Sequence, residues 1–257
     1  MTDPLSTQRA YYNAIAGEYD SSYSSPYALL YRKELFADIL KGVALGGIRV
    51  LDMACGGGQN SLFFKEHEAE VVGLDISDAQ CAIFRRRFTD SAVVTGSMTA
   101  MGFADASFDM VVTESLHHSH PHLDQCLAEV HRVLKPGGRF LLWEPECGSA
   151  FDRARKLWYR LDPQYFQDNE ASIDIDLVLK AFEGKAVVDR LQYGGNLAHL
   201  FVLSSMHFRI PPAAVKYYAR PLMAMENMLN KLNSRLFSMW VLCVLRKEAS
   251  LNTDGTS

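Results

Sequence analysis

Residues 50–61 read Val-Leu-Asp-Met-Ala-Cys-Gly-Gly-Gly-Gln-Asn-Ser, and this stretch decides the fold. The apolar run that includes Ile48, Val50 and Leu51 is typical of a buried parallel strand. The three glycines at 56–58 let backbone amides approach a ligand where a side chain would collide, and the helix expected after them points its N-terminus at that ligand. The stretch therefore predicts a strand, a glycine turn and a helix suited to nucleotide binding.

A second strand with an acidic end follows after a spacing of about twenty residues, as in dinucleotide-binding folds. Residues 71–75 read Val-Val-Gly-Leu-Asp, so the carboxylate of Asp75 ends this strand, where an acidic side chain holds ribose hydroxyls. A dinucleotide fingerprint needs a further glycine three residues after the second one. Here Gln59, Asn60 and Ser61 follow the glycines instead, which disfavours NAD as the ligand.

Residues 51–58 resemble motif I of the class I S-adenosylmethionine-dependent methyltransferases, in the form Leu-Asp-x-Ala-Cys-Gly-x-Gly. Ala54 occupies the position of the usual first glycine. Residues 71–75, 103–112 and 131–140 continue the resemblance in the family's order, and the likeness fades beyond residue 150. The resemblance implies an enzyme that uses S-adenosyl-L-methionine as its methyl donor.

The chain around this motif alternates between strand and helix patterns. Strands are expected at 48–53, 70–74, 92–95 and 140–143, and helices at 59–66, 78–88 and 123–134. Ser77 and Gln80 predict a capping box that begins the second of these helices. Strands that alternate with helices predict an α/β fold with a doubly wound, mostly parallel sheet. The resemblance makes it the seven-stranded, Rossmann-like methyltransferase sheet, with a final antiparallel strand at 237–245.

The sequence predicts one methyltransferase domain over residues 46–248, preceded by a helical lid over 1–45 and followed by a disordered tail over 249–257. Substrate-covering insertions are expected at about 146–175 and at 197–235, where prolines divide short helices. A helix is expected at 173–182. A further strand is expected at 186–193.

Cofactor residues are expected in the loops beyond the carboxyl ends of the strands, where doubly wound sheets bind their ligands. Asp52 would receive the ammonium group of the methionine moiety, although capping of the following turn is an alternative. Ser97 stands where most relatives carry an aspartate for the adenine amino group. The expected cofactor-binding set is Asp52, Ala54, Gly56, Gly58, Asn60, Asp75, Ile76, Ser97, Met98 and Glu114.

A histidine-rich loop supplies the candidate bases. Residues 114–122 read Glu-Ser-Leu-His-His-Ser-His-Pro-His, without the helical i, i+4 pair that frames many zinc sites, so no metal is expected. A base is needed only when the acceptor must lose a proton. His118 and His117 are the preferred candidates, and Glu144 and Glu146 are the alternatives. The histidines could instead merely shape the pocket, and the carboxylates could be solvent-exposed loop residues.

The substrate prediction rests on residues 197–235, which are richer in Leu, Met, Tyr and Phe than a connection between strands requires. Such side chains form adaptable apolar pockets, so a lipophilic or aromatic acceptor is expected between this insert and the N-terminal helix. The candidate substrate-binding residues are Tyr11, Tyr19, Tyr218 and Met225. Packing on the sheet, or a homodimer contact, is the alternative.

Composition limits the remaining possibilities. The 257 residues carry a net charge of −4, which argues against a nucleic-acid partner, and the basic run at 85–87 is interpreted as a solvated helix face. The N-terminus lacks signal-peptide features and the longest apolar run is too short to cross a bilayer, so a cytoplasmic enzyme is expected. We expect methyl transfer to an O, N or C atom of a small molecule, such as a natural-product or envelope-lipid intermediate. Other chemistry on S-adenosylmethionine, or a non-catalytic regulatory subunit, are the alternatives.

Overall fold

A seven-stranded sheet forms the centre of the computed structural model, which describes residues 4–161 and 172–249. Its strands, in the order β3-β2-β1-β4-β5-β7-β6, are β3 (Ala92–Thr95), β2 (Glu70–Asp75), β1 (Arg49–Met53), β4 (Phe108–Thr113), β5 (Leu134–Pro145), β7 (Trp240–Lys247) and β6 (Ala186–Gly194). Strands β1 to β5 pair in parallel, whereas β7 runs antiparallel to both β5 and β6. The predicted α/β fold, with its antiparallel last strand, is confirmed.

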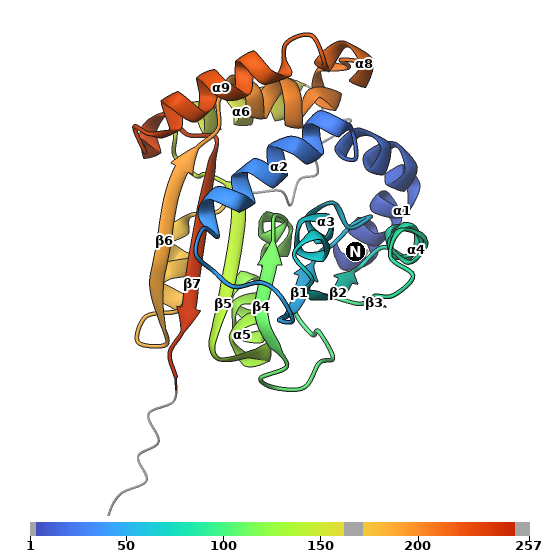
Figure 1. Cartoon of the computed structure of the whole chain (residues 1–257), viewed down its shortest axis with the longest axis vertical. Coiled ribbons are helices and arrows are strands. Elements are labelled where there is room, and N and C mark those ends of the chain that lie inside the picture. Colours follow the sequence, from blue (N-terminus) through green and yellow to red (C-terminus); the bar gives the residue numbers. More distant parts are fainter. Residues whose placement is uncertain (1–3, 162–171, 250–257) are drawn as a thin grey trace, which may run out of the picture.

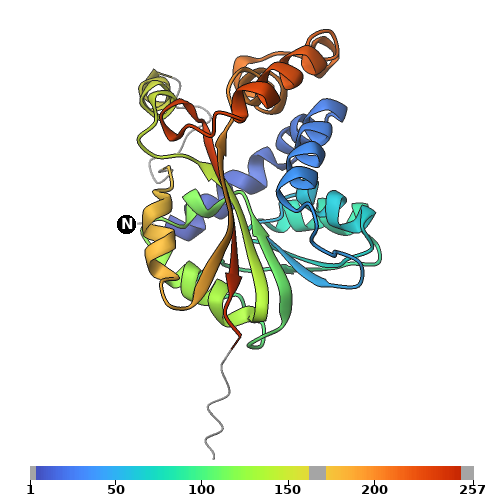
Figure 2. The ribbon, with the colours of Figure 1, turned by 60° about the vertical axis from the view of Figure 1, so that its left-hand side comes forward.

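Helices cover both faces of this sheet (Figures 1 and 2). They are α1 (Pro4–Tyr23), α2 (Pro26–Ile39), α3 (Gln59–Glu66), α4 (Asp78–Arg87), α5 (Leu123–Val133), α6 (Ala150–Leu161), α7 (Ile175–Ala181), α8 (Pro212–Val215) and α9 (Ala219–Asn230), with the short helices η1 (Leu116–Ser119), η2 (His199–Leu203), η3 (Ser205–Phe208) and η4 (Arg235–Phe237). Alternate residues of a strand point to opposite faces, so Val50 packs in a core with α2 and α3, and Leu51 in a second core with α5 and α7. None of the described helices is both long and apolar enough to span a membrane.

The element boundaries follow the predictions closely in the first half of the chain and less closely in the second. Helix α3 and strand β3 have the predicted bounds. Strand β5 begins at Leu134 rather than at residue 140, because residues 136–138 form a bulge within β5, opposite the register shift of β4. The last strand begins at Trp240 rather than 237, because residues 235–237 form η4.

The predicted capping box at the start of α4 is only half correct. Ser77 Oγ accepts a hydrogen bond from the backbone N–H of Gln80 at 3.1 Å, as expected. The backbone N–H of Ser77 donates to Asp75 Oδ1 at 2.8 Å rather than to the Gln80 side chain. Asp75 replaces the glutamine because it ends β2 three residues before α4 begins, and Gln80 instead lines the cavity described below.

The insert between β6 and β7 is fastened to α2 by one buried carboxylate. Glu226 of α9 is 1% exposed and accepts hydrogen bonds from the Tyr31 hydroxyl at 2.5 Å and from three backbone N–H groups of residues 196–199. Several donors around one buried carboxylate hold it in a fixed position. The insert is therefore a packed layer at the carboxyl-terminal end of the parallel strands (Figure 1).

Candidate active site

A cavity lies where the loops after β1, β2, β3 and β4 converge, with α1 across it. This is the end of the sheet at which the sequence places the ligand. The lining residues are Leu5, Gln8, Tyr12, Tyr19, Ala54, Cys55, Gly56, Gln59, Asn60, Asp75, Ile76, Gln80, Gly96, Ser97, Met98, Thr99, Glu114, Ser115, His118, Ser119, His120 and His122. Most of the predicted cofactor residues are thus brought together.

The glycine turn between β1 and α3 has the backbone that the motif predicts. Gly56 and Gly58 have φ angles of +52° and +89°, in the left-handed region that favours glycine. A Cβ at Gly58 would overlap the rings of Phe84 and Phe88. Ala54 also has a positive φ, +58°. Glycine adopts such a φ most easily, which explains why motif I usually has glycine at this position.

Asp75 joins the second strand to this turn. Its Oδ2 accepts a hydrogen bond from the backbone N–H of Gly56 at 2.8 Å, and its Oδ1 accepts the one from Ser77 already described. The side chain is 8% exposed and lines the cavity, and burial raises its pKa against the opposing effect of these backbone bonds. Each carboxylate oxygen accepts two hydrogen bonds, so both can still bind ligand hydroxyls.

Asp52 does not line the cavity. The side chain is fully buried, and its Oδ2 accepts a hydrogen bond from Ser61 Oγ of α3 at 2.6 Å. Burial raises the pKa of Asp52 to about 7. Its Oδ1 has no hydrogen-bond partner among the described residues, which leaves one buried acceptor behind the glycine turn.

A buried arginine, which is not among the predicted site residues, contacts two residues that line the cavity. Arg32 of α2 is 2% exposed, forms an ion pair with Glu114 and donates to Asn60 Oδ1 at 2.8 Å. Because arginine only donates, this bond fixes the Asn60 amide with its oxygen toward Arg32. The Asn60 amide nitrogen is then free to donate to a group other than Arg32. The positive charge of Arg32 compensates the negative charge of Glu114. No pattern around residue 32 distinguishes this arginine from a surface residue of an amphipathic helix.

The histidine-rich loop is held by hydrogen bonds to Glu144 of β5. This carboxylate, 1% exposed, accepts hydrogen bonds from the backbone N–H of Leu116 at 2.6 Å and of His117 at 3.2 Å. Glu144 Oε2 also lies 2.8 Å from His117 Nδ1. Burial raises the pKa of Glu144 to about 8. His117 and Glu144 therefore lie behind the cavity wall, and neither lines the cavity.

His118 is the candidate base that reaches the cavity. Its Nε2 lies 3.0 Å from the hydroxyl of Tyr12, and its ring is 3.9 Å from that of His117 between centroids. Burial, and secondarily the neighbouring His117, hold the pKa of His118 well below its usual value, so the imidazole is neutral near pH 7. A neutral imidazole has one nitrogen able to accept a proton.

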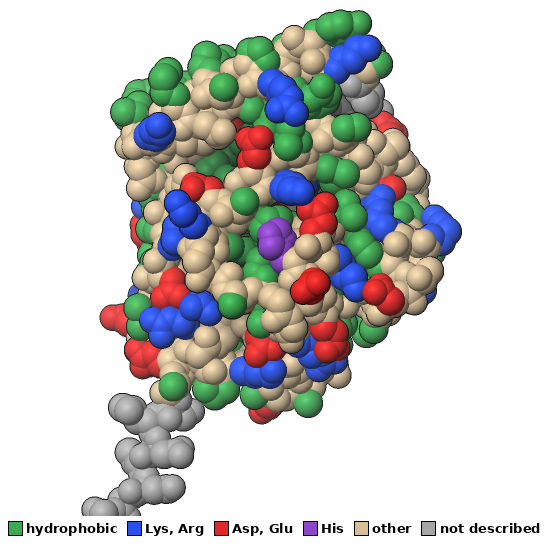
Figure 3. Space-filling view, in the orientation of Figure 1, with side chains coloured by type: hydrophobic (Ala, Val, Ile, Leu, Met, Phe, Trp, Pro, Cys, Tyr) green, Lys and Arg blue, Asp and Glu red, His purple; other side chains and the backbone are tan. Residues whose placement is uncertain are grey.

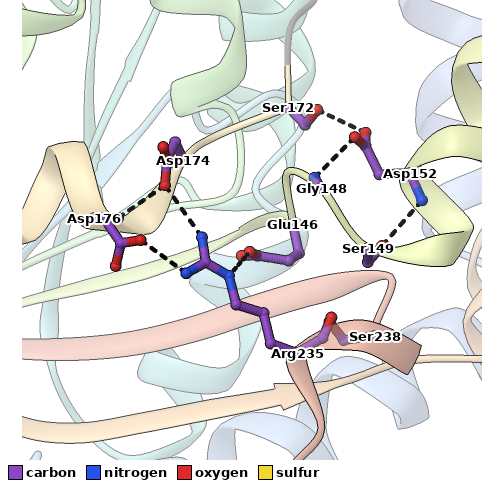
Figure 4. A network of polar contacts seen from close by, with 9 residues as sticks. All are labelled: Glu146, Gly148, Ser149, Asp152, Ser172, Asp174, Asp176, Arg235 and Ser238. Carbon is purple, nitrogen blue, oxygen red and sulfur yellow. Dashed lines mark hydrogen bonds and ion pairs between the residues drawn. The ribbon is translucent and has the colours of Figure 1, made fainter.

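Four candidate residues other than Asp52, Gly58, His117 and Glu144 also lie outside the cavity lining. Glu146 is fully buried beside Arg235, in a cluster with Asp174 and Asp176 outside the cavity (Figure 4). The alternative that Glu144 and Glu146 are solvent-exposed is therefore wrong. The remaining three, Tyr11, Tyr218 and Met225, are absent from the cavity lining, and the Tyr218 hydroxyl donates to the Phe201 carbonyl.

Helix α1 is tied to the cavity by polar contacts. Asp20 pairs with Arg87 at 2.9 Å, and Arg87 also donates to the Gly57 carbonyl. Asn13 Oδ1 accepts from Ser77 Oγ at 2.7 Å. The interpretation of residues 85–87 as a solvated face is thus wrong for Arg87, which links α4 to α1 and the glycine turn. In the described parts of the chain no group of three or more ligating side chains could hold a metal ion.

Comparisons with known proteins agree with this geometry. Residues 51–142 match the family model of a methyltransferase domain. The phthiotriol/phenolphthiotriol dimycocerosates methyltransferase of Mycobacterium tuberculosis is 39% identical over 102 residues, which make up 38% of this chain and 38% of that protein. The matched region thus spans well under half the length of this curated relative.

Two solved structures share the fold over nearly the whole chain. Magnesium protoporphyrin IX methyltransferase from Synechocystis PCC 6803, solved with bound SAH, has a TM-score of 0.64 at 12% identity and covers 96% of this chain and 100% of its own. The [4+2]-cyclase SpnF has a TM-score of 0.65 at 15% identity and covers 97% and 98%. Residues 51–142 therefore form a methyltransferase domain, and the chain has the fold of the class I S-adenosylmethionine-dependent methyltransferases.

Proposed function

We propose that the cavity binds S-adenosyl-L-methionine and that the protein transfers its methyl group to an O, N or C atom of a small lipophilic or aromatic molecule. The observation that carries this proposal is the convergence of Asp75, Gly56, Asn60 and His118 on one cavity. The methyltransferase-domain match over residues 51–142 supports the same chemistry. The net charge of −4 favours a small-molecule acceptor over nucleic acid, and a cytoplasmic location is part of the proposal.

The residues present suit the methyl donor. The Asp75 carboxylate can accept from both ribose hydroxyls, and the apolar side chains of Ile76 and Met98 can contact the adenine ring. Ser97 is held by Thr99, whose backbone N–H donates to Ser97 Oγ at 3.2 Å. Asn60 lines the cavity beside the glycine turn, and its amide nitrogen can donate to the amino-acid end of the methyl donor.

The donor supplies a methyl group on a positively charged sulfur, which makes the carbon reactive without further activation. When bound, the donor would supply this carbon to an electron pair of the acceptor, and the electrons of the carbon–sulfur bond would go to sulfur. The protein has to align the two partners and exclude water, which is the task of α1 and the loops around the cavity. Tyr19 of α1 is half-buried and lines the cavity on the α1 side.

His118 is the residue that we assign to take the proton from an acceptor that must lose one. It lines the cavity, it is neutral, and the Tyr12 hydroxyl holds its ring in place. His117 and Glu144 act as positioning residues, since their contacts fix the loop that carries His118.

Methyl-labelled S-adenosylmethionine tests the proposal. Incubated with the protein and a small-molecule cell extract, it should deliver label to an extractable organic product. His118→Ala should slow this transfer at least about tenfold, within the range of a general base, while binding the donor as tightly as the unaltered chain. Donor binding without methyl transfer to any fraction would favour other chemistry or a regulatory subunit. An equal rate of transfer by His118→Ala would contradict the assignment of His118 as the base.

A further inference from the structure

Helix α9 and the turn that follows it expose large apolar side chains at the surface. The inner face of α9 carries the buried Ala219, Met223 and Glu226. On the opposite side Met228 is 63% exposed, and Leu232, one turn further on, is 75% exposed. A surface helix normally turns polar residues outward, so this face is suited to a partner rather than to water.

Neighbouring elements extend this apolar surface. Tyr217 before α9 is 78% exposed, and Leu236 and Phe237 of η4 are 55% and 63% exposed. Helix α6, which packs against η4, adds the exposed Leu157. We call the exposed parts of α8, α9 and η4 the α9 surface, and its large exposed apolar residues are Tyr217, Met228, Leu229, Leu232, Leu236 and Phe237.

The charge of the α9 surface is opposite in sign to that of the whole chain. Residues 197–238 contain five basic residues and a single acidic one, Glu226, in a chain with a net charge of −4. Glu226 is buried and occupied by Tyr31 and backbone groups, and Arg235 is paired with carboxylates (Figure 4). Three further basic residues in and beside α8 and α9 are exposed, namely Lys216, Arg220 and Lys231. Figure 3 shows hydrophobic and basic side chains along the edge of the molecule formed by α8 and α9, with acidic ones below.

We infer that the α9 surface docks the protein on an anionic lipid bilayer. Exposed leucine, methionine, phenylalanine and tyrosine side chains enter the boundary between headgroups and acyl chains, and lysine and arginine contact the phosphates. A second copy of the chain fits this surface less well. In a two-fold dimer the same patch meets itself, so Arg220 and Lys231 would face like charges with no exposed carboxylate of this insert to pair with.

The orientation gives docking a consequence for the cavity. Figures 1 and 2 show α9 beyond the carboxyl ends of the parallel strands, the same end of the sheet that carries the cavity. A chain bound through the α9 surface therefore has this end toward the bilayer, from which a lipophilic acceptor could enter. The docking itself does not depend on methyl transfer, so the two proposals can fail separately.

Vesicle co-sedimentation of the full chain tests the inference. We expect binding to vesicles of equal phosphatidylcholine and phosphatidylglycerol, and much weaker binding to phosphatidylcholine alone. Charge reversal by Arg220→Glu with Lys231→Glu should weaken binding at least about tenfold, because each basic residue near an anionic surface contributes about fivefold. Met228→Gln with Leu232→Gln should weaken it as well, and these exposed substitutions leave the core intact.

The matched control substitutions are on helices outside the α9 surface. Arg85→Glu with Arg86→Glu reverses two exposed charges on α4, and Leu177→Gln removes an exposed leucine from α7; both should bind vesicles like the unaltered chain. Equal weakening by the controls, or no difference between the two vesicle compositions, would overturn the inference. A concentration-dependent dimer that Met228→Gln with Leu232→Gln dissociates, without vesicle binding, would assign the surface to a second copy instead.

Discussion

The Asp75 carboxylate accepts a hydrogen bond from the backbone N–H of Gly56 at 2.8 Å, across 19 positions of the sequence. The bond joins the acidic end of β2 to the turn after β1, so the two halves of the nucleotide-binding pattern form one rigid unit. A carboxylate fixed by backbone donors loses little freedom when a ligand binds, which favours affinity. Because this bond holds Asp75 against the turn at the cavity, the side chain is nearly buried and still lines the cavity.

The glycine turn should tolerate no side chain at its third glycine. Gly58→Ala places a Cβ at a φ of +89° and against the rings of Phe84 and Phe88, so we expect the free energy of unfolding to fall by at least about 2 kcal/mol. Gly17→Ala, at an exposed helical position with open space, should instead raise it by about 0.5–1 kcal/mol. Urea denaturation measures both. Equal effects of the two substitutions would contradict the packing described for the turn.

The hydroxyl of Tyr12 should affect methyl transfer through His118. Tyr12→Phe removes the group 3.0 Å from His118 Nε2, so we expect kcat to fall about fivefold, the value of one hydrogen bond, with donor affinity unchanged. Tyr11→Phe is the matched control, since Tyr11 neighbours Tyr12 but does not line the cavity. Steady-state kinetics with isothermal titration of the donor separates the two effects. A larger loss of kcat in Tyr11→Phe than in Tyr12→Phe would instead support Tyr11 as the substrate-binding residue predicted from the sequence.

The buried Glu144 should make the protein less stable as the pH rises. Burial raises its pKa from 4.5 to about 8, so between these values the folded chain holds a proton that the unfolded chain has lost. Proton binding to the folded state stabilises it at low pH, and this contribution disappears as the pH passes through 8. In Glu144→Gln the decline in the free energy of unfolding between pH 5 and 8 should therefore be shallower.

Denaturation at a series of pH values, with Glu18→Gln as an exposed control, measures this slope. An unchanged slope in Glu144→Gln would mean that Glu144 is ionised in the folded protein.

The sequence predicts the sheet and many of the residues that line the cavity, because local patterns encode both. The strand and turn at 50–61, the carboxylate at Asp75 and the Leu123 to Val133 helix are each readable from neighbouring residues. Arg32, Tyr12 and Arg87 were missed or misread, since each reaches a partner far away in sequence, as Arg32 reaches Glu114. Tyr218 was assigned to a pocket because apolar composition does not distinguish a pocket wall from a packed layer.

Binding of S-adenosylmethionine by isothermal titration calorimetry tests the central claim most directly. The unaltered chain should bind the donor and its demethylated product in preference to NAD. Asp75→Ala should lose about 1.5–3 kcal/mol of binding free energy, a decrease of about tenfold to more than a hundredfold in affinity. Asp78→Ala, which removes an exposed carboxylate three residues further on, should bind normally. Unchanged affinity in Asp75→Ala would contradict the ribose assignment, and preferential binding of NAD would contradict the proposed function itself.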